Sequence, residues 1–187
     1  MRNLLLSLTL AGTAFFRPAS AGTPQLGLQG QPYVLGPVFE QTVAGGTYLH
    51  LDCETNLAGI GTQIQALVPK LKQALMATRT QPMGPLEVIY HGVDGNPETR
   101  FRMEVGFLVP EGTQAAGEAR TRVLLPFHCA SMTFTGKVAD LGQAYGSLYG
   151  SLHTSGKTPS EESRQMILYW EGPASTNDLL LIQAGIR

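Results

Sequence analysis

The sequence of 187 residues has few charges and no cluster of charges of one sign. Only 14% of the residues are charged, the formal net charge is −1, and Lys and Arg form no run. Nucleic-acid binding depends on clustered phosphate contacts, so this distribution argues against a DNA- or RNA-binding surface. Beyond the N-terminus no apolar stretch reaches the ~20 residues of a membrane-spanning helix. We therefore expect one globular domain with no membrane-embedded part.

Recognisable catalytic and cofactor motifs are also missing. There is no Gly-x-Ser-x-Gly elbow, no phosphate-binding loop and no dinucleotide fingerprint, so no catalytic residue and no cofactor is predicted. Zinc-ligand spacings are absent as well. In a strand His50 and Asp52 would share a face while Cys53 points away, and His128 and Cys129 are adjacent rather than facing, so no metal site is expected.

The one long apolar stretch lies at the N-terminus and is typical of a secretory signal peptide. One positive charge at Arg2 precedes a mostly apolar segment, 4–16, and the triplet 19–21 is Ala-Ser-Ala. This is the order of charged region, apolar region and cleavage site in exported proteins. We predict a signal peptide at 1–21, cleavage after Ala21, an extended lead at 22–38, and a periplasmic or secreted mature protein.

Export would place the only two cysteines, Cys53 and Cys129, in an oxidising compartment. Two thiols in a small exported domain pair more often than they stay free, which favours a disulfide between them. The alternative is two separately buried cysteines that act as small apolar residues. The sequence does not give the distance between their Cα atoms, so both interpretations remain open.

The apolar periodicity predicts the same series of elements twice. Each half begins with a strand, continues with a helix that has one apolar stripe, and ends with two strands. Pro69 is expected to kink or break the first helix. The half-domains span 39–110 and 120–187, with a connector at 111–119.

The strands that close each half are expected at 86–91 and 101–109, then at 164–170 and 179–186; a single strand from 120 to 134 should open the second half. Strand, helix, strand, strand, repeated once, predicts an α+β fold with an antiparallel sheet and both helices on one face. A pseudo-twofold of this kind predicts a small-molecule cleft on its axis.

Four segments resemble the GyrI-like family of small-molecule-binding domains, also found as the effector-binding half of AraC-type and MerR-type multidrug regulators. In order along 39–187 they are 83–91 (MGPLEVIYH), 102–110 (RMEVGFLVP), 141–148 (LGQAYGSL) and 178–183 (DLLLIQ). The resemblance implies binding of hydrophobic, often cationic, organic molecules in a cleft lined by aromatic and acidic side chains. Some stand-alone members are similar to hydrolases of cyclopropane-bearing toxins.

The chain departs from the family pattern at several points. Many relatives carry Glu at the positions occupied here by Gln165 and Leu181, so two candidate carboxylates are missing and hydrolysis is not favoured. The regulators carry a helix-turn-helix domain before this module. Here the expected signal peptide and lead precede it, so transcription control is not expected.

Glu104 is the carboxylate expected to line the cleft, because alternation places it on the non-core face of its strand and it matches the family pattern. The alternative is a solvated strand residue paired with Arg102. Aromatic side chains with polar tips suit a ligand wall, although core packing competes as an explanation for each. The predicted ligand-binding set is Tyr90, Glu104, Tyr145, Tyr149, Trp170 and Glu171, with Tyr169 as a further aromatic candidate.

These observations predict an exported protein that binds an amphipathic or cationic organic molecule between its half-domains, for sequestration or sensing. One alternative is a hydrolase of a reactive small molecule, in which Glu104 positions water and a Tyr hydroxyl donates a proton. Another is an envelope interaction protein, with a filled cleft and an apolar patch elsewhere on its surface.

Overall fold

The computed structural model describes residues 32–172 and 174–187. The predicted signal peptide and its cleavage site lie outside these residues. No helix in the described part of the chain is long and apolar enough to cross a membrane. The elements are β1 (Val34–Leu35), β2 (Phe39–Val43), β3 (Gly46–Thr55), α1 (Ile60–Thr78), β4 (Leu86–His91), β5 (Phe101–Val109), β6 (Arg120–Leu124), β7 (Phe127–Thr135), α2 (Leu141–Thr154), β8 (Pro159–Tyr169) and β9 (Leu179–Ile186).

The strand order confirms the predicted duplication. The antiparallel strands lie in the order β1-β7-β9-β8-β4-β5-β3-β6, with β2 also paired to β7. Within it the first half contributes β4-β5-β3 and the second half β8-β9-β7, so the same series runs outward from the centre in both directions. The halves join where β4 pairs with β8, and the pseudo-twofold axis passes through this pair.

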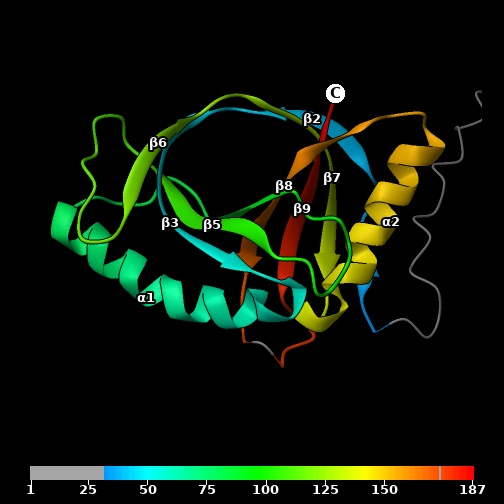
Figure 1. Cartoon of the computed structure of the whole chain (residues 1–187), viewed down its shortest axis with the longest axis horizontal. Coiled ribbons are helices and arrows are strands. Elements are labelled where there is room, and N and C mark those ends of the chain that lie inside the picture. The colour runs from blue at the N-terminus through cyan, green and yellow to red at the C-terminus, as the bar shows by residue number, and fades with distance from the viewer. Residues whose placement is uncertain (1–31, 173) are drawn as a thin grey trace, which may run out of the picture.

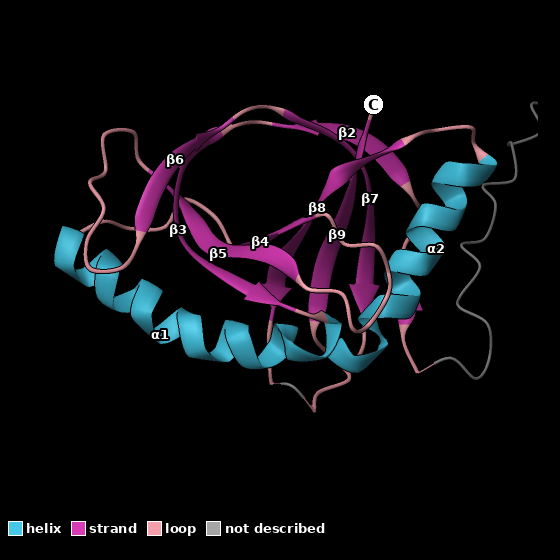
Figure 2. Cartoon of the chain, in the orientation of Figure 1, coloured by secondary structure: helices cyan, strands magenta, loops and turns pink. Residues whose placement is uncertain are grey.

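Each helix packs its apolar stripe on its own half of the sheet, and together they cover one face (Figures 1 and 2). Leu67, Leu71 and Leu75 of α1 belong to a core with β3, β4 and β5. Leu148 of α2 belongs to a second core with β7 and β9. Tyr145 packs against both cores, so the two halves meet at this α2 residue.

The chain passes between the halves in two long segments, one made of β2 and β3 and the other of β6 and β7. These two segments pair with each other, and we call them the arch. β2 pairs with β7 as far as Val43, and pairing resumes between β3 and β6 at Gly46. Figure 1 shows both segments passing over the top of the view. A Cβ atom at Gly45 would lie 2.1 Å from the backbone oxygen of Leu124, so this close approach requires glycine.

Several boundaries differ from the sequence-based predictions. Helix α1 continues through Pro69, since Pro69 and Gln65 are both exposed and the carbonyl that loses its partner can bind water. The strand expected at 120–134 is divided at Pro126 into β6 and β7. Strand β8 begins at Pro159, earlier than predicted, and within the lead Val34 and Leu35 pair with β7.

The two cysteines are free, which corrects the predicted disulfide. Cys53 packs on the helix-side core of the first half, whereas Cys129 lies beside Ser131 on the opposite face of β7. Four strands separate β3 from β7 along the sheet, a path of roughly 24 Å at the usual strand spacing. A disulfide needs Cα atoms about 4.4–6.8 Å apart, so these two residues cannot pair in this fold.

Candidate functional site

The central strands carry buried polar side chains on both faces of the sheet. On the helix-covered face, five residues from both halves form what we call the aromatic seam. Its members are Tyr90 of β4, Tyr145 and Tyr149 of α2, and Ser163 and Gln165 of β8. The register pairs Val88 with Gln165 and Tyr90 with Ser163, which places the seam on the pseudo-twofold axis.

Hydrogen bonds and ring contacts hold the seam together. The Tyr90 hydroxyl donates to Oε1 of Gln165 at 3.0 Å, and the Tyr145 hydroxyl donates to the backbone oxygen of Arg164 at 2.8 Å. The Tyr90 and Tyr145 rings are perpendicular with centroids 6.4 Å apart, and Tyr145 stacks on Tyr149 at 6.3 Å. Such arrangements are favourable for aromatic pairs.

The seam is apolar in its walls and electrically neutral. Tyr90 and Gln165 are 3% and 2% exposed, while Tyr145 and Tyr149 are half-buried. Burial raises the pKa of all three tyrosines, and no carboxylate contributes to any of these shifts. The hydroxyls are therefore neutral groups that can donate or accept a hydrogen bond near neutral pH.

The opposite face, beneath the arch, contains a buried charge network centred on Glu104, which is 0% exposed. Its Oε1 accepts hydrogen bonds from His91 at 2.9 Å and from Arg102. Its Oε2 accepts from Nε of Arg122 at 2.9 Å. Glu104 thus does pair with Arg102, as one sequence interpretation held, but it is buried instead of solvated.

These partners determine the ionisation of Glu104. Burial alone would raise its pKa, but hydrogen bonds from His91 and Arg122 and the charge of Arg122 outweigh burial and lower the pKa to about 2. The carboxylate is therefore ionised, and its negative charge is already compensated inside the fold. Glu104 leaves no oxygen free for a ligand cation or a catalytic water.

A second buried ion pair joins the two halves on the same face. Nη1 of Arg164 lies 3.1 Å from Oε1 of Glu87, and Nε of Arg164 lies 2.7 Å from Oε1 of Glu162. The guanidinium also lies 4.1 Å from the centroid of the Phe127 ring. Arg164 and Glu87 are 4% and 2% exposed, so this contact between β8 and β4 is almost free of solvent.

His50, Asp52 and Glu104 bring metal-ligating atoms within 4.8 Å of one another. The sequence placed His50 and Asp52 on one face but did not reveal that β3 pairs with β5 so that Asp52 lies opposite Glu104. Arginines already occupy the carboxylates: Arg102 lies 3.2 Å and Arg120 3.3 Å from oxygens of Asp52. Their positive charges oppose a metal ion at this position.

The predicted ligand-binding residues fall into three separate places. Tyr90, Tyr145 and Tyr149 come together in the seam, whereas Glu104 lies on the other face of the sheet. Glu171 is exposed in the turn after β8, where it accepts hydrogen bonds from Tyr169 at 2.9 Å and from Ser175 and Asn177. Trp170 is 42% exposed at the same end. Glu171 thus holds the turn together, and neither Glu171 nor Trp170 belongs to the seam.

Three polar side chains on the two faces of the sheet were not identified from the sequence: Gln165 in the seam, and Arg122 and Arg164 beneath the arch. Gln165 was noted only for the carboxylate it lacks, yet it is the buried polar centre of the seam. Arg122 and Arg164 were not singled out, although alternating charged residues at 120 and 122, and at 162 and 164, could have indicated a charged inner face. Their partners lie on other strands, which the local pattern does not identify.

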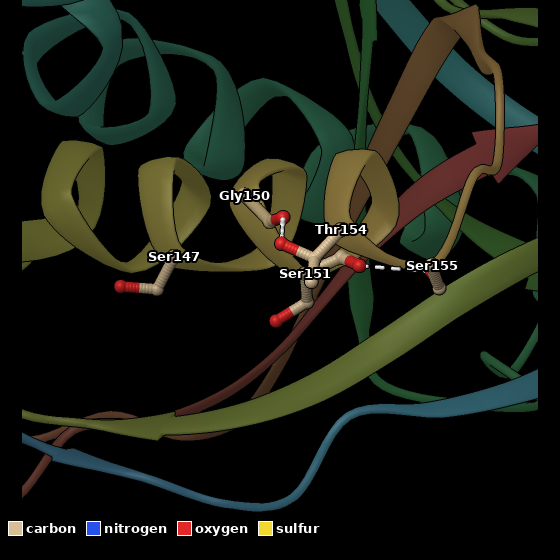
Figure 3. Close-up of a pocket in the computed structure, with 5 residues that line it drawn as sticks. All are labelled: Ser147, Gly150, Ser151, Thr154 and Ser155. Carbon is tan, nitrogen blue, oxygen red and sulfur yellow. Dashed lines mark hydrogen bonds between the residues drawn. The ribbon is translucent and has the colours of Figure 1, made fainter.

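Two surface hollows in the described part of the chain lack the features of a ligand site. One lies on the exposed side of α2 and is lined by Ser147, Gly150, Ser151, Thr154 and Ser155 (Figure 3). The hydroxyls of Ser147, Thr154 and Ser155 donate to backbone carbonyls of the helix itself, as when Thr154 donates to the Gly150 carbonyl at 2.9 Å. The other is more apolar and is lined by Met83, Leu108 and Val123, among others, near the outer edge of the first half.

Comparisons with known proteins agree with this fold. The model of the GyrI-like small molecule binding domain matches residues 41–182. No curated protein matches the sequence. The EcmrR–DNA complex in EcmrR-RPo has a TM-score of 0.70 at 13% identity over 83% of this chain, and this chain spans 58% of EcmrR.

Two further structures are similar over nearly their whole length. The crystal structure of the EcmrR C-terminal domain has a TM-score of 0.65 at 12% identity, covering 81% of this chain and 97% of that domain. SAV2435 bound to tetraphenylphosphonium has a TM-score of 0.59 at 8% identity, covering 81% and 94%. At these identities the structures show a common fold. Since the family model matches most of the sequence, the chain belongs to the GyrI-like family of small-molecule-binding domains.

Proposed function

We propose that this protein binds an amphipathic organic molecule in the aromatic seam and acts by sequestration or as a sensing module outside the cytoplasm. One observation carries the proposal. Three tyrosines and an amide from both halves converge at the pseudo-twofold axis. A junction between duplicated halves, with apolar walls and a few convergent polar groups, is a usual position for a small-molecule site.

The half-buried members of the seam suggest how a ligand enters. Tyr145 and Tyr149 lie on α2 and reach solvent, whereas Tyr90 and Gln165 lie behind them on the sheet. A ligand has to displace one of the α2 rings to contact Gln165. It would then stack on the tyrosines and use the hydroxyl and amide groups that now bond to one another.

The other polar face supports binding less well. There every strongly buried charge already has a partner of opposite charge, as with Glu104 and Arg122 or Glu87 and Arg164. A ligand would have to break these contacts, and an uncompensated buried charge is costly. The bound tetraphenylphosphonium of SAV2435 also supports a small organic ligand for this fold.

Truncation of Tyr149 to alanine is expected to weaken ligand binding about tenfold, because it removes one stacking wall of the seam. Isothermal titration calorimetry of the full chain with triphenylphosphine oxide and methyltriphenylphosphonium measures the effect. Tyr169→Ala is the matched control, since Tyr169 is 52% exposed outside the seam and its loss should leave affinity unchanged. Equal weakening by both variants, or no saturable binding of either compound, would contradict the proposal.

The hydrolase alternative receives no support from the geometry. It requires Glu104 and a tyrosine hydroxyl to act together, but the seam tyrosines lie on the opposite face of the sheet. Both carboxylate oxygens of Glu104 are also occupied by His91, Arg102 and Arg122.

The interaction-protein alternative retains one observation. Met83 and Val123 are 69% and 70% exposed and line the same apolar hollow. Exposed apolar surface of this kind can bind a partner protein. The calorimetric experiment distinguishes small-molecule binding from partner-protein binding, since an interaction protein with an unused seam would bind neither compound.

Export rests on the N-terminal sequence. Its charged start, apolar segment and Ala-Ser-Ala triplet support cleavage after Ala21. N-terminal sequencing of the protein recovered from the periplasm or medium of a bacterial host should give Gly22 as the first residue. Recovery of the intact chain from the cytoplasm would contradict this part of the proposal.

A further inference from the structure

The polar atoms of the aromatic seam carry no net charge. They belong to three phenol hydroxyls, the Ser163 hydroxyl and the Gln165 side-chain amide. Only burial raises the pKa of Tyr90, and the shifts of Tyr145 and Tyr149 have no contribution from an acidic side chain. Tyr48 on the opposite face differs, because the charges of Glu87 and Glu104 add to the effect of burial in raising its pKa.

The buried carboxylates of the central strands, Glu87 and Glu104, lie on that opposite face, whereas the exposed Glu161 of β8 is paired with Arg187. Glu87 precedes Val88, the register partner of Gln165, and therefore points away from the seam. Glu87, Glu104 and Glu162 are each paired with an arginine. An organic cation in the seam would lose its hydration without gaining a counter-charge, which is unfavourable. Cation–π contacts with the tyrosines, worth about 0.5–2 kcal/mol, would offset part of this cost.

Gln165 also supplies an available hydrogen-bond donor. Its Oε1 accepts the Tyr90 hydroxyl at 3.0 Å, so its Nε2 amide is the group of this side chain that can donate to a ligand. An amide nitrogen has two N–H donors, and a buried donor gains most from an acceptor oxygen.

On the basis of the proposed function, we propose that the seam selects neutral aromatic molecules that carry an acceptor oxygen, such as a carbonyl or phosphoryl group, and discriminates against organic cations. The Gln165 amide would bind the acceptor oxygen and the tyrosine rings would contact the aromatic groups. Selectivity thus depends on the buried side chain of Gln165. Glutamate at this position would differ from glutamine only in charge and donor capacity.

Triphenylphosphine oxide and methyltriphenylphosphonium form a matched pair for the test. Both place three phenyl rings on phosphorus, but one has a neutral acceptor oxygen and the other a fixed positive charge. Calorimetry of the full chain at pH 8 should give a dissociation constant at least about tenfold lower for the oxide. Equal or tighter binding of the phosphonium would overturn the selectivity and leave the proposed function intact. Binding of neither would contradict the proposed function itself.

Gln165→Glu should reverse the preference. A carboxylate near the bound cation should tighten phosphonium binding by about tenfold or more, increasingly as the pH rises and the buried acid ionises. Oxide binding should weaken, because the donor is lost. Glu171→Gln is the matched control at an exposed carboxylate outside the seam and should leave both affinities unchanged. An unchanged preference in Gln165→Glu would overturn the inference.

A thermal unfolding transition shows whether Gln165→Glu folds. If it does not, Gln165→Met provides the test, since methionine has a similar volume without donor or charge. Oxide binding by Gln165→Met should fall about tenfold with no gain for the phosphonium. Full retention of oxide affinity in this variant would overturn the role of Gln165.

Discussion

Arg164→Met is expected to lower the free energy of unfolding by about 3–5 kcal/mol, because it leaves the Glu87 carboxylate buried without a counter-charge. Arg164 is 4% exposed and is the guanidinium that pairs with Glu87 across the junction of β8 and β4. The same substitution removes the contact of the guanidinium with the Phe127 ring. Urea-induced unfolding followed by circular dichroism measures the effect.

Two variants make the Arg164 measurement specific. Arg187→Met removes the partner of Glu161 in an exposed pair, and such pairs contribute about 0–1 kcal/mol. Adding Glu87→Gln to Arg164→Met removes the orphaned charge and should recover part of the lost stability. A loss below about 1 kcal/mol in Arg164→Met would show that this ion pair does not hold the two halves together.

Stability should also depend on pH through Glu104. Its pKa in the fold is about 2, against an ordinary value of 4.5. A lowered pKa means that the stabilisation is fully present above pH 4.5 and is lost as the pH falls towards 2. The shift corresponds to about 3 kcal/mol. The opposing contribution of Glu87, whose pKa burial raises in spite of Arg164, must be separated from this effect.

Glu104→Gln isolates the effect of Glu104. The variant should be less stable than the wild type at pH 6, and the difference should shrink as the pH approaches 2. Its dissociation constants for seam ligands should stay unchanged, because Glu104 lies on the other face of the sheet. A constant difference across this pH range would contradict the compensated charge that the geometry assigns to Glu104.

Much of the fold could be predicted because the signals are local. The strands 86–91, 101–109 and 179–186 occur with the predicted bounds, since alternating or continuous apolar residues end at clear turn residues. The arch could not be predicted, because it depends on pairing between segments far apart in sequence. A close approach such as that of Gly45 to Leu124 leaves no local pattern beyond a glycine.

The candidate site was predictable in residue type but not in grouping. Alternation correctly placed Glu104 away from the helix-side core, but the arch buries that face and supplies Arg122 from a distant strand. The helical stripe placed Tyr145 in the core, and the structure shows that this core contact is also the junction of the two halves. Only the pairing of β4 with β8 brings Tyr90 to Gln165 and so defines the seam.

A crystal structure of the full chain with triphenylphosphine oxide tests the central claim most directly. The account predicts electron density between the tyrosines of the seam, with a displaced Tyr145 or Tyr149 ring and the phosphoryl oxygen within hydrogen-bond distance of Gln165 Nε2. Density beneath the arch beside Glu104, or in the apolar hollow between Met83 and Val123, with the seam unchanged, would contradict it.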